Sequence, residues 1–172
     1  ARDGDVIEID EGDYFADTAV IDKDELTIRG TGPNVRLVAS GASAEGKAIM
    51  VVRRGQVTLS NLQFIGARVA DGNGAGIRFE GGHLRVVNCL FHGNQNGLLT
   101  TSAPGAELEI ESSEFGYNGA GDGYTHNLYV GKIASLTVTG SYFHHANVGH
   151  LLKSRAARNR IVHNRLTDES GG

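Results

Sequence analysis

Basic and histidine side chains cluster near the end of the chain, in the stretch S-Y-F-H-H-A-N-V-G-H-L-L-K-S-R that begins at Ser141. Lys153 and Arg155 lie two residues apart, so in an extended strand their side chains point the same way. A lysine beside another cation can act as a general base, and a histidine can act as an acid. The stretch therefore predicts either proton transfer by Lys153, Arg155 and His144 or a solvated turn of a scaffold.

The histidines of this stretch also suggest a zinc site. His144 and His145 are adjacent, so an extended chain sends their side chains to opposite faces. His150 falls at an inward position of the repeat described below. Three ligands would have to converge from opposite faces, with no acid at helical spacing to support them. We therefore predict no metal site, and a hydrogen-bonded interior position for His150.

The elements that must position these residues form a repeat. Four segments align without gaps and a weaker fifth copy follows: 57–64, 84–91, 108–115, 136–143 and 159–166. Each copy alternates apolar and polar residues and closes on Phe or Leu, with a period of about two dozen residues. Short strands at this period are typical of a parallel β-solenoid. The gapless alignment favours a solenoid over a β-sandwich of hairpins.

Composition is consistent with one all-β domain. Glycine occurs 25 times against 2 prolines, which indicates many tight turns. We predict a single domain over 1–172, with irregular coils at 1–56, regular repeats at 57–166 and a tail at 167–172. The net charge of −4 argues against a nucleic-acid partner, and no apolar run is long enough to cross a membrane. The single cysteine, Cys89, excludes an intrachain disulfide.

Motifs at both ends of the chain carry a family resemblance. They are D-G-D-V-I-E-I-D-E-G-D-Y and L-T-I-R-G-T-G near the start, then H-N-L-Y-V-G and the stretch from Ser141. The chain resembles the right-handed parallel β-helix, or pectate-lyase-like, superfamily, and within it bacterial β-helix repeat proteins of unassigned activity. The resemblance implies a right-handed β-helix of about six or seven coils. Members usually begin with a capping helix, so we expect a piece truncated at one or both ends.

Alternation in a second register predicts which side chains point outward. This register starts after each closing Phe, and its second residues form an outward column: Arg78, Leu99, Tyr129 and Leu151. Two insertions, 65–76 and 116–127, lie along this column and bring Tyr124 and His126 to its rim. The insertions either form the walls of a groove or fold over the sheet as caps.

The resemblance implies carbohydrate chemistry. Signature motifs of polygalacturonases and alginate epimerases are missing, and the acids near the column are too few for a calcium-dependent pectate lyase. Calcium at D-G-N-G or D-G-Y-T is a weak alternative, since both also read as turns, and no other cofactor is expected. What remains is a polysaccharide lyase that uses β-elimination from a uronic acid. Its candidate catalytic residues are Lys153 and Arg155, helped by Tyr129, His126 or His144.

Two functions are consistent with these patterns. The first is a secreted or periplasmic bacterial protein that binds or processes an acidic polysaccharide, because tyrosines beside charged groups suit sugars. Its substrate-binding candidates would be Tyr129, Leu99, Arg78, His126 and Tyr124. The second is a non-catalytic solenoid that associates end to end, because 1–25 is acidic and 150–169 is basic. The first predicts an open groove over Tyr129, and the second predicts loops that cover it.

Overall fold

The computed structural model describes residues 1–168, and every regular element in that range is a β-strand. The strands wind into a parallel β-solenoid of about six turns, which confirms the predicted fold class. Residues 169–172 of the predicted tail lie outside the described range. Among residues 1–168, no helix is long and apolar enough to cross a membrane.

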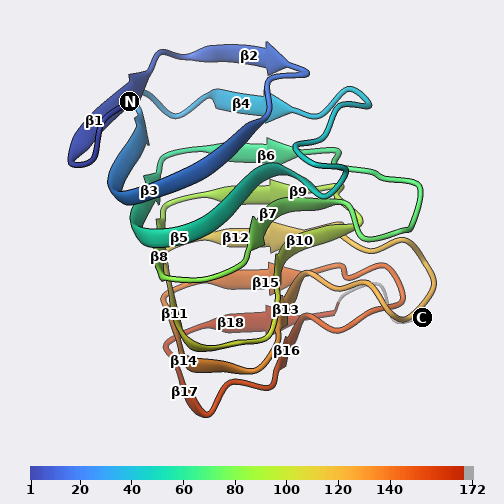
Figure 1. Cartoon of the computed structure of the whole chain (residues 1–172). Coiled ribbons are helices and arrows are strands. Elements are labelled where there is room, and N and C mark those ends of the chain that lie inside the picture. Colours follow the sequence, from blue (N-terminus) through green and yellow to red (C-terminus); the bar gives the residue numbers. More distant parts are fainter. Residues whose placement is uncertain (169–172) are drawn as a thin grey trace.

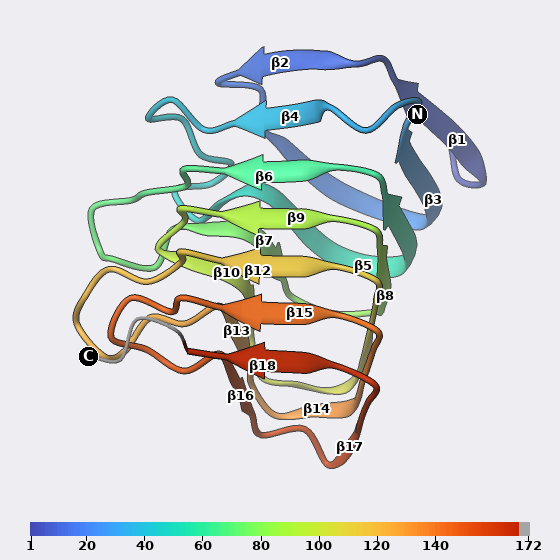
Figure 2. The same ribbon diagram turned by 180° about the vertical axis from the view of Figure 1, so that it is seen from behind.

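Two sheets make up the solenoid (Figures 1 and 2). The seven-stranded sheet contains β2 (Gly12–Phe15), β4 (Val35–Val38), β6 (Gln63–Ile65), β9 (Leu90–His92), β12 (Glu114–Gly116), β15 (Tyr142–His144) and β18 (Arg165–Thr167). The eleven-stranded sheet contains β1 (Asp5–Ile9), β3 (Ala19–Gly30), β5 (Ala48–Ser60), β7 (Ala75–Phe79), β8 (His83–Val87), β10 (Asn96–Thr100), β11 (Ala103–Glu111), β13 (Leu128–Val130), β14 (Ile133–Thr139), β16 (Leu152–Ser154) and β17 (Arg158–Val162).

The eleven-stranded sheet bends and so supplies two of the three faces of the solenoid. The first half of β5 pairs with β7, and its second half pairs with β8. One face therefore continues through β7, β10, β13 and β16, and the other through β8, β11, β14 and β17. Each later coil consists of three short strands, such as β7, β8 and β9. We call the face formed by β7, β10, β13 and β16 the groove face.

The core is a ladder of aromatic rings enclosed by apolar strands. Phe64, Phe91, Phe115 and Phe143 are fully buried and stack on one another with ring centroids 5.1, 4.3 and 4.7 Å apart. The pairing register joins Phe64 to Phe91 and each later ring to the next. The gapless sequence alignment is therefore the register of the sheet, because residues at equal repeat positions pair with each other.

The last coil differs from the predicted register by two residues. Tyr129 pairs with Lys153, so Lys153 occupies the outward position that was predicted for Leu151. The prediction that His150 faces the interior is wrong, because His150 is exposed. Leu128 pairs with Leu152, and the backbone N–H of Asn127 donates to the carbonyl of His150 at 3.1 Å. The corner before β16 is therefore two residues longer than predicted.

Both ends of the described solenoid expose apolar side chains. Val6 and Phe15 lie on β1 and β2, and Ile161 and Leu166 lie on β17 and β18. The predicted end-to-end association would use these surfaces, and it stays a prediction.

Candidate functional site

A groove of about 400 Å³ lies on the groove face. Its floor is the outward column Arg78, Leu99, Tyr129 and Lys153, one residue from each of four successive coils. Both insertions project from the same side of the solenoid (Figure 1) and form walls, with Asn73 from the first and Tyr124 and His126 from the second. Tyr129 is half-buried and Tyr124 is 85% exposed, whereas Leu99 is buried, so the groove is open over Tyr129 but covered over Leu99.

Side-chain hydrogen bonds hold the two walls in place. The amide oxygen of Gln95 accepts the backbone N–H groups of Val69 and Gly74, both at 2.8 Å, which fixes the first insertion. In the second insertion, Asp122 Oδ1 accepts the N–H and the hydroxyl of Thr125 at 3.0 and 2.8 Å. The backbone N–H of Tyr124, which also donates to Oδ1 at 2.8 Å, and then the Thr125 hydroxyl lower the pKa of Asp122. In this structure the D-G-Y-T motif is therefore a turn.

Three cations line the groove without carboxylate partners. Arg78, Lys153 and Arg155 make no ion pair within the described chain. By contrast, six other arginines of the solenoid pair with acids: Arg29, Arg36, Arg53, Arg54, Arg85 and Arg158. An unpaired cation is available to an anionic ligand without first breaking an existing pair.

The two cations of the last coil lie over an aromatic ring. Lys153 Nζ is 5.7 Å from the centroid of the Tyr129 ring, and the guanidinium carbon of Arg155 is 5.9 Å from it. Such contacts between cations and rings are attractive and restrict where the long side chains lie. Tyr129 therefore gathers two positive charges at one end of the groove, and Arg78 lies toward the other end.

His126 is a buried, neutral hydrogen-bond donor in the wall of the groove. The residue is 1% exposed, and its Nδ1 accepts the backbone N–H of His150 at 3.0 Å. Burial, and then the nearby charge of Lys153, lower the pKa of His126 to about 4. Because Nδ1 is an acceptor, the proton of the neutral ring is on Nε2. That Nε2 is buried and has no hydrogen-bond partner, and the same is true of Arg78 Nε.

A ladder of buried asparagines anchors the segment that carries His126. Asn94 donates to Asn118 Oδ1 at 3.0 Å, and Asn118 donates to Asn127 Oδ1 at 2.8 Å. On the other side, Asn96 Oδ1 accepts the backbone N–H of His126 at 3.0 Å. The ring of His126 then lies 5.7 Å from that of Tyr129, with 20° between their planes. The fold thus fixes both rings relative to the groove.

The state of His126 predicts how stability depends on pH. Its folded pKa of about 4 is below the value of about 6.5 in the unfolded chain. The stabilisation is therefore complete above pH 6.5 and is lost as the pH falls toward 4. We expect the free energy of unfolding to fall by roughly 2 kcal/mol between pH 7 and pH 4.5 from this group alone. Urea denaturation at both pH values measures it.

The control for this prediction is His126→Gln, which removes the titrating ring. Acids such as Asp22 and Glu45 have lowered pKa values and make the same contribution in both proteins. The wild type should therefore lose more stability than the variant over this pH range. Equal losses would contradict the assignment of a low pKa to His126.

The structure brings together seven of the eight site residues predicted from sequence. Arg78, Leu99, Tyr124, His126, Tyr129, Lys153 and Arg155 all line the groove. His144 does not, because β15 places its side chain on the outer side of the seven-stranded sheet. There its ring lies 4.3 Å from that of Tyr142, and its Nε2 lies 3.1 Å from Glu114 Oε1. A catalytic role for His144 in the groove has no geometric support.

Sequence reasoning missed three polar residues of the groove: Asn73, Asn96 and Thr100. Asn96 and Thr100 lie at the ends of β10, where they follow the core pattern, and Asn73 lies in an insertion of turn-forming residues. No sequence signal separates them from ordinary scaffold positions. Within residues 1–168, no group of three or more His, Cys, Asp or Glu side chains is placed to hold a metal ion.

The chain was compared with known proteins. No family model matches it, and no solved structure matches it. The chemistry of the groove therefore has to be argued from its own residues.

Proposed function

We propose that this is a secreted or periplasmic bacterial β-helix protein, right-handed and pectate-lyase-like, that binds an acidic polysaccharide in the groove over Tyr129. The observation that carries the proposal is that three cations without carboxylate partners share one open groove with this ring. A uronate chain offers a negative charge on each sugar and an apolar face that can pack on Tyr129.

The spacing of the cations favours a polymer over a single sugar. Arg78 and Lys153 are separated by three coil steps, or about 14 Å at about 4.8 Å per step. One sugar cannot reach both, so the ligand would be an oligosaccharide with a carboxylate near each end of the groove. Between them lies the half-buried ring of Tyr129, on which the sugars in between can pack.

The reaction that this groove suits is uronate β-elimination. Lys153 Nζ would take the C5 proton beside the carboxylate, the C–H electrons would form the C4=C5 double bond, and the C4–O bond would break. Arg155 would stabilise the negative charge that develops on the carboxylate. The leaving oxygen would take a proton from the Tyr129 hydroxyl. No metal or cofactor is required for this step.

Binding is the direct test. We expect a hexasaccharide of galacturonic or mannuronic acid to bind at about 0.1 M salt and to bind more weakly at about 1 M. The triple variant Arg78→Ala, Lys153→Ala, Arg155→Ala should bind about 100-fold more weakly, since each charge contact is worth about 1 kcal/mol. Isothermal titration calorimetry measures both effects.

Arg85→Ala is the matched control, because Arg85 lies on β8, outside the groove face, and pairs with Glu111. It should leave the affinity unchanged. Uronate binding that survives in the triple variant would place the ligand elsewhere and refute the proposal.

A further inference from the structure

The outward column on the floor of the groove continues by one coil beyond Arg78, to Val51 on β5. The two residues pair in the register of the sheet, so the side chain of Val51 points outward like that of Arg78. An outward side chain on an uncovered sheet is exposed to water, yet Val51 is fully buried and does not line the groove. The sheet is therefore covered directly beside Arg78.

The cover is the segment of residues 39–47, which joins β4 to β5 and which we call the end segment. Its Ala44 is buried in one apolar cluster with Val51. A tight turn fixes Ala44 there, because its backbone N–H donates to the carbonyl of Ala48 at 2.7 Å. In Figure 1 the end segment projects on the same side of the solenoid as the two insertions. It therefore forms a wall across the groove face at the Arg78 end.

Ion pairs join the end segment to the neighbouring coils. Lys47 Nζ lies 2.7 Å from a carboxylate oxygen of Glu80 and 3.1 Å from one of Glu45. Arg53 pairs with Glu45 and, at 3.6 Å, with Asp22. Both cations of the wall are thus already compensated, unlike the cations that line the groove. A uronate chain that extended over this wall would gain no unpaired cation and would meet three carboxylates.

The opposite end of the groove has no such wall within the described chain. Lys153 lies on β16, the last strand of the groove face in residues 1–168, and Arg155 just after it is exposed. Tyr129, one coil earlier, is half-buried and lines the groove. The groove therefore has a closed end at Arg78 and an open end at Lys153 and Arg155.

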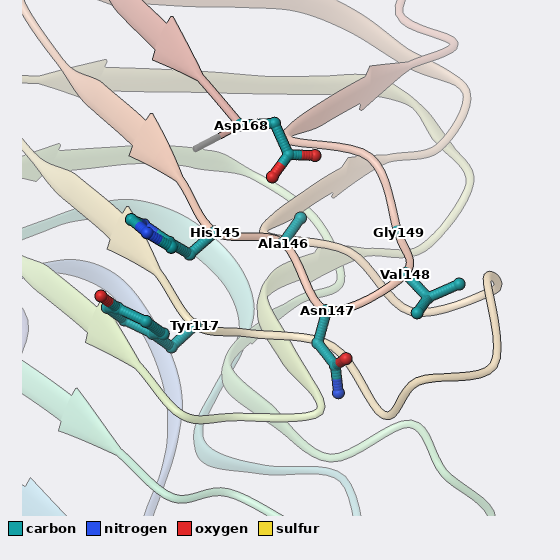
Figure 3. A pocket seen from close by; sticks show the side chains of 7 residues that line it. All are labelled: Tyr117, His145, Ala146, Asn147, Val148, Gly149 and Asp168. Atoms are coloured by element: carbon teal, nitrogen blue, oxygen red, sulfur yellow. The ribbon is translucent and has the colours of Figure 1, made fainter. Parts of the chain in front are cut away.

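A second hollow, of about 620 Å³, does not extend the groove (Figure 3). The two share no lining residue. The second insertion contributes Tyr117 to the hollow and Tyr124 and His126 to the groove, so it separates them. A chain bound in the groove therefore has one way out, past the last coil.

We propose that the groove binds the end of a uronate chain and not its middle, an inference that rests on the proposed function of the groove. The terminal sugar would lie against the end segment with its carboxylate at Arg78, and the rest of the chain would leave past Lys153 and Arg155. If Lys153 is the base, it would act about 14 Å from the closed end, at about 4.8 Å per coil step. Each reaction would then release a fragment of one length.

Galacturonate chains of increasing length test this proposal. With fractions of about 10, 20 and 40 sugars, the number of protein molecules bound per chain should stay constant, because each chain offers the same ends. A groove open at both ends would bind along the chain, and the number would rise about fourfold from the shortest to the longest fraction. Sedimentation velocity at saturating protein measures the number directly.

The possible failures of this experiment are distinguishable. A number that rises in proportion to chain length overturns the closed end, while the uronate groove itself stands. If no fraction binds, the proposed function of the groove is refuted, and the binding of a chain end is refuted with it.

Replacing residues 40–46 with the dipeptide Gly-Gly tests the end segment itself, because it removes Ala44 from the outward side chain of Val51. We expect this variant to bind more protein per chain as the chains lengthen, since the groove face is then open beyond Arg78. A folded variant with a constant number would overturn the role of the end segment. Circular dichroism checks the fold, and if the variant does not fold, the wild-type series decides alone.

Discussion

Replacing Phe115 with alanine is expected to lower the free energy of unfolding by about 3 to 5 kcal/mol. Phe115 is fully buried at the centre of the aromatic ladder, with one ring 4.3 Å away and another 4.7 Å away. Removing its ring leaves a cavity that the parallel strands cannot close, because their spacing is fixed by backbone hydrogen bonds. It also ends both ring contacts, each worth about 0.5 to 1.5 kcal/mol in such pairs.

The ladder supplies its own control for this experiment. Leu166 follows Phe143 in the pairing register, so it occupies the same repeat position in the last coil, but it is 45% exposed. Leu166→Ala should therefore cost less, about 1 kcal/mol, since nearly half of its surface already contacts water. Chemical denaturation followed by circular dichroism measures both variants. Equal costs at the two positions would mean that the central rings do not form the core.

The fold could be predicted from sequence because its repeated segments between residues 57 and 143 align without gaps. From residue 57 to residue 143, each closing Phe pairs with the next Phe in the register. In a parallel solenoid, residues at equal repeat positions are neighbours in space, so residues one period apart in the sequence are in contact in the fold. The column Arg78, Leu99 and Tyr129 followed from the same rule and is found in the groove.

The last coil could not be predicted in the same way. Its corner is joined to the preceding coil by contacts between loops, such as the bond from the N–H of His150 to Nδ1 of His126, which joins residues 24 positions apart. Repeat spacing carries no information about such contacts. The two-residue difference moved His150 out of the core and put Lys153 in register with Tyr129.

The chemically distinctive features of the groove are also invisible to sequence. A donor without a partner, such as His126 Nε2 or Arg78 Nε, is defined by everything that surrounds it. The surroundings of His144 are also invisible to sequence. It follows a closing Phe, and from that position its side chain could face either the groove or the outer side of the seven-stranded sheet. Sequence patterns gave the direction of side chains along strands, whereas the pairing of polar atoms across loops required the folded structure.

If the groove carries out uronate elimination, Lys153→Ala should lower kcat about 10²- to 10⁴-fold, the range expected when a general base is removed. Lys153 is the candidate base because its amine lies on the floor of the groove, in register with Tyr129, and makes no ion pair within residues 1–168. The product has a C4=C5 double bond conjugated with the carboxylate, so its ultraviolet absorbance reports the reaction directly. Polygalacturonate and alginate are the substrates to use.

Lys132→Ala is the matched control, because Lys132 is an exposed lysine just after β13 and does not line the groove. It should leave kcat unchanged. A base and a binding residue differ in their kinetic signature: loss of the base lowers kcat, whereas loss of a binding charge raises KM. Lys153→Ala with unchanged kcat and raised KM would therefore assign Lys153 to binding alone.

His126 is already neutral above about pH 5. It should therefore add no ionisation to the pH profile of kcat in the neutral range. An ionisation step that is still present in that range in His126→Gln belongs to another group.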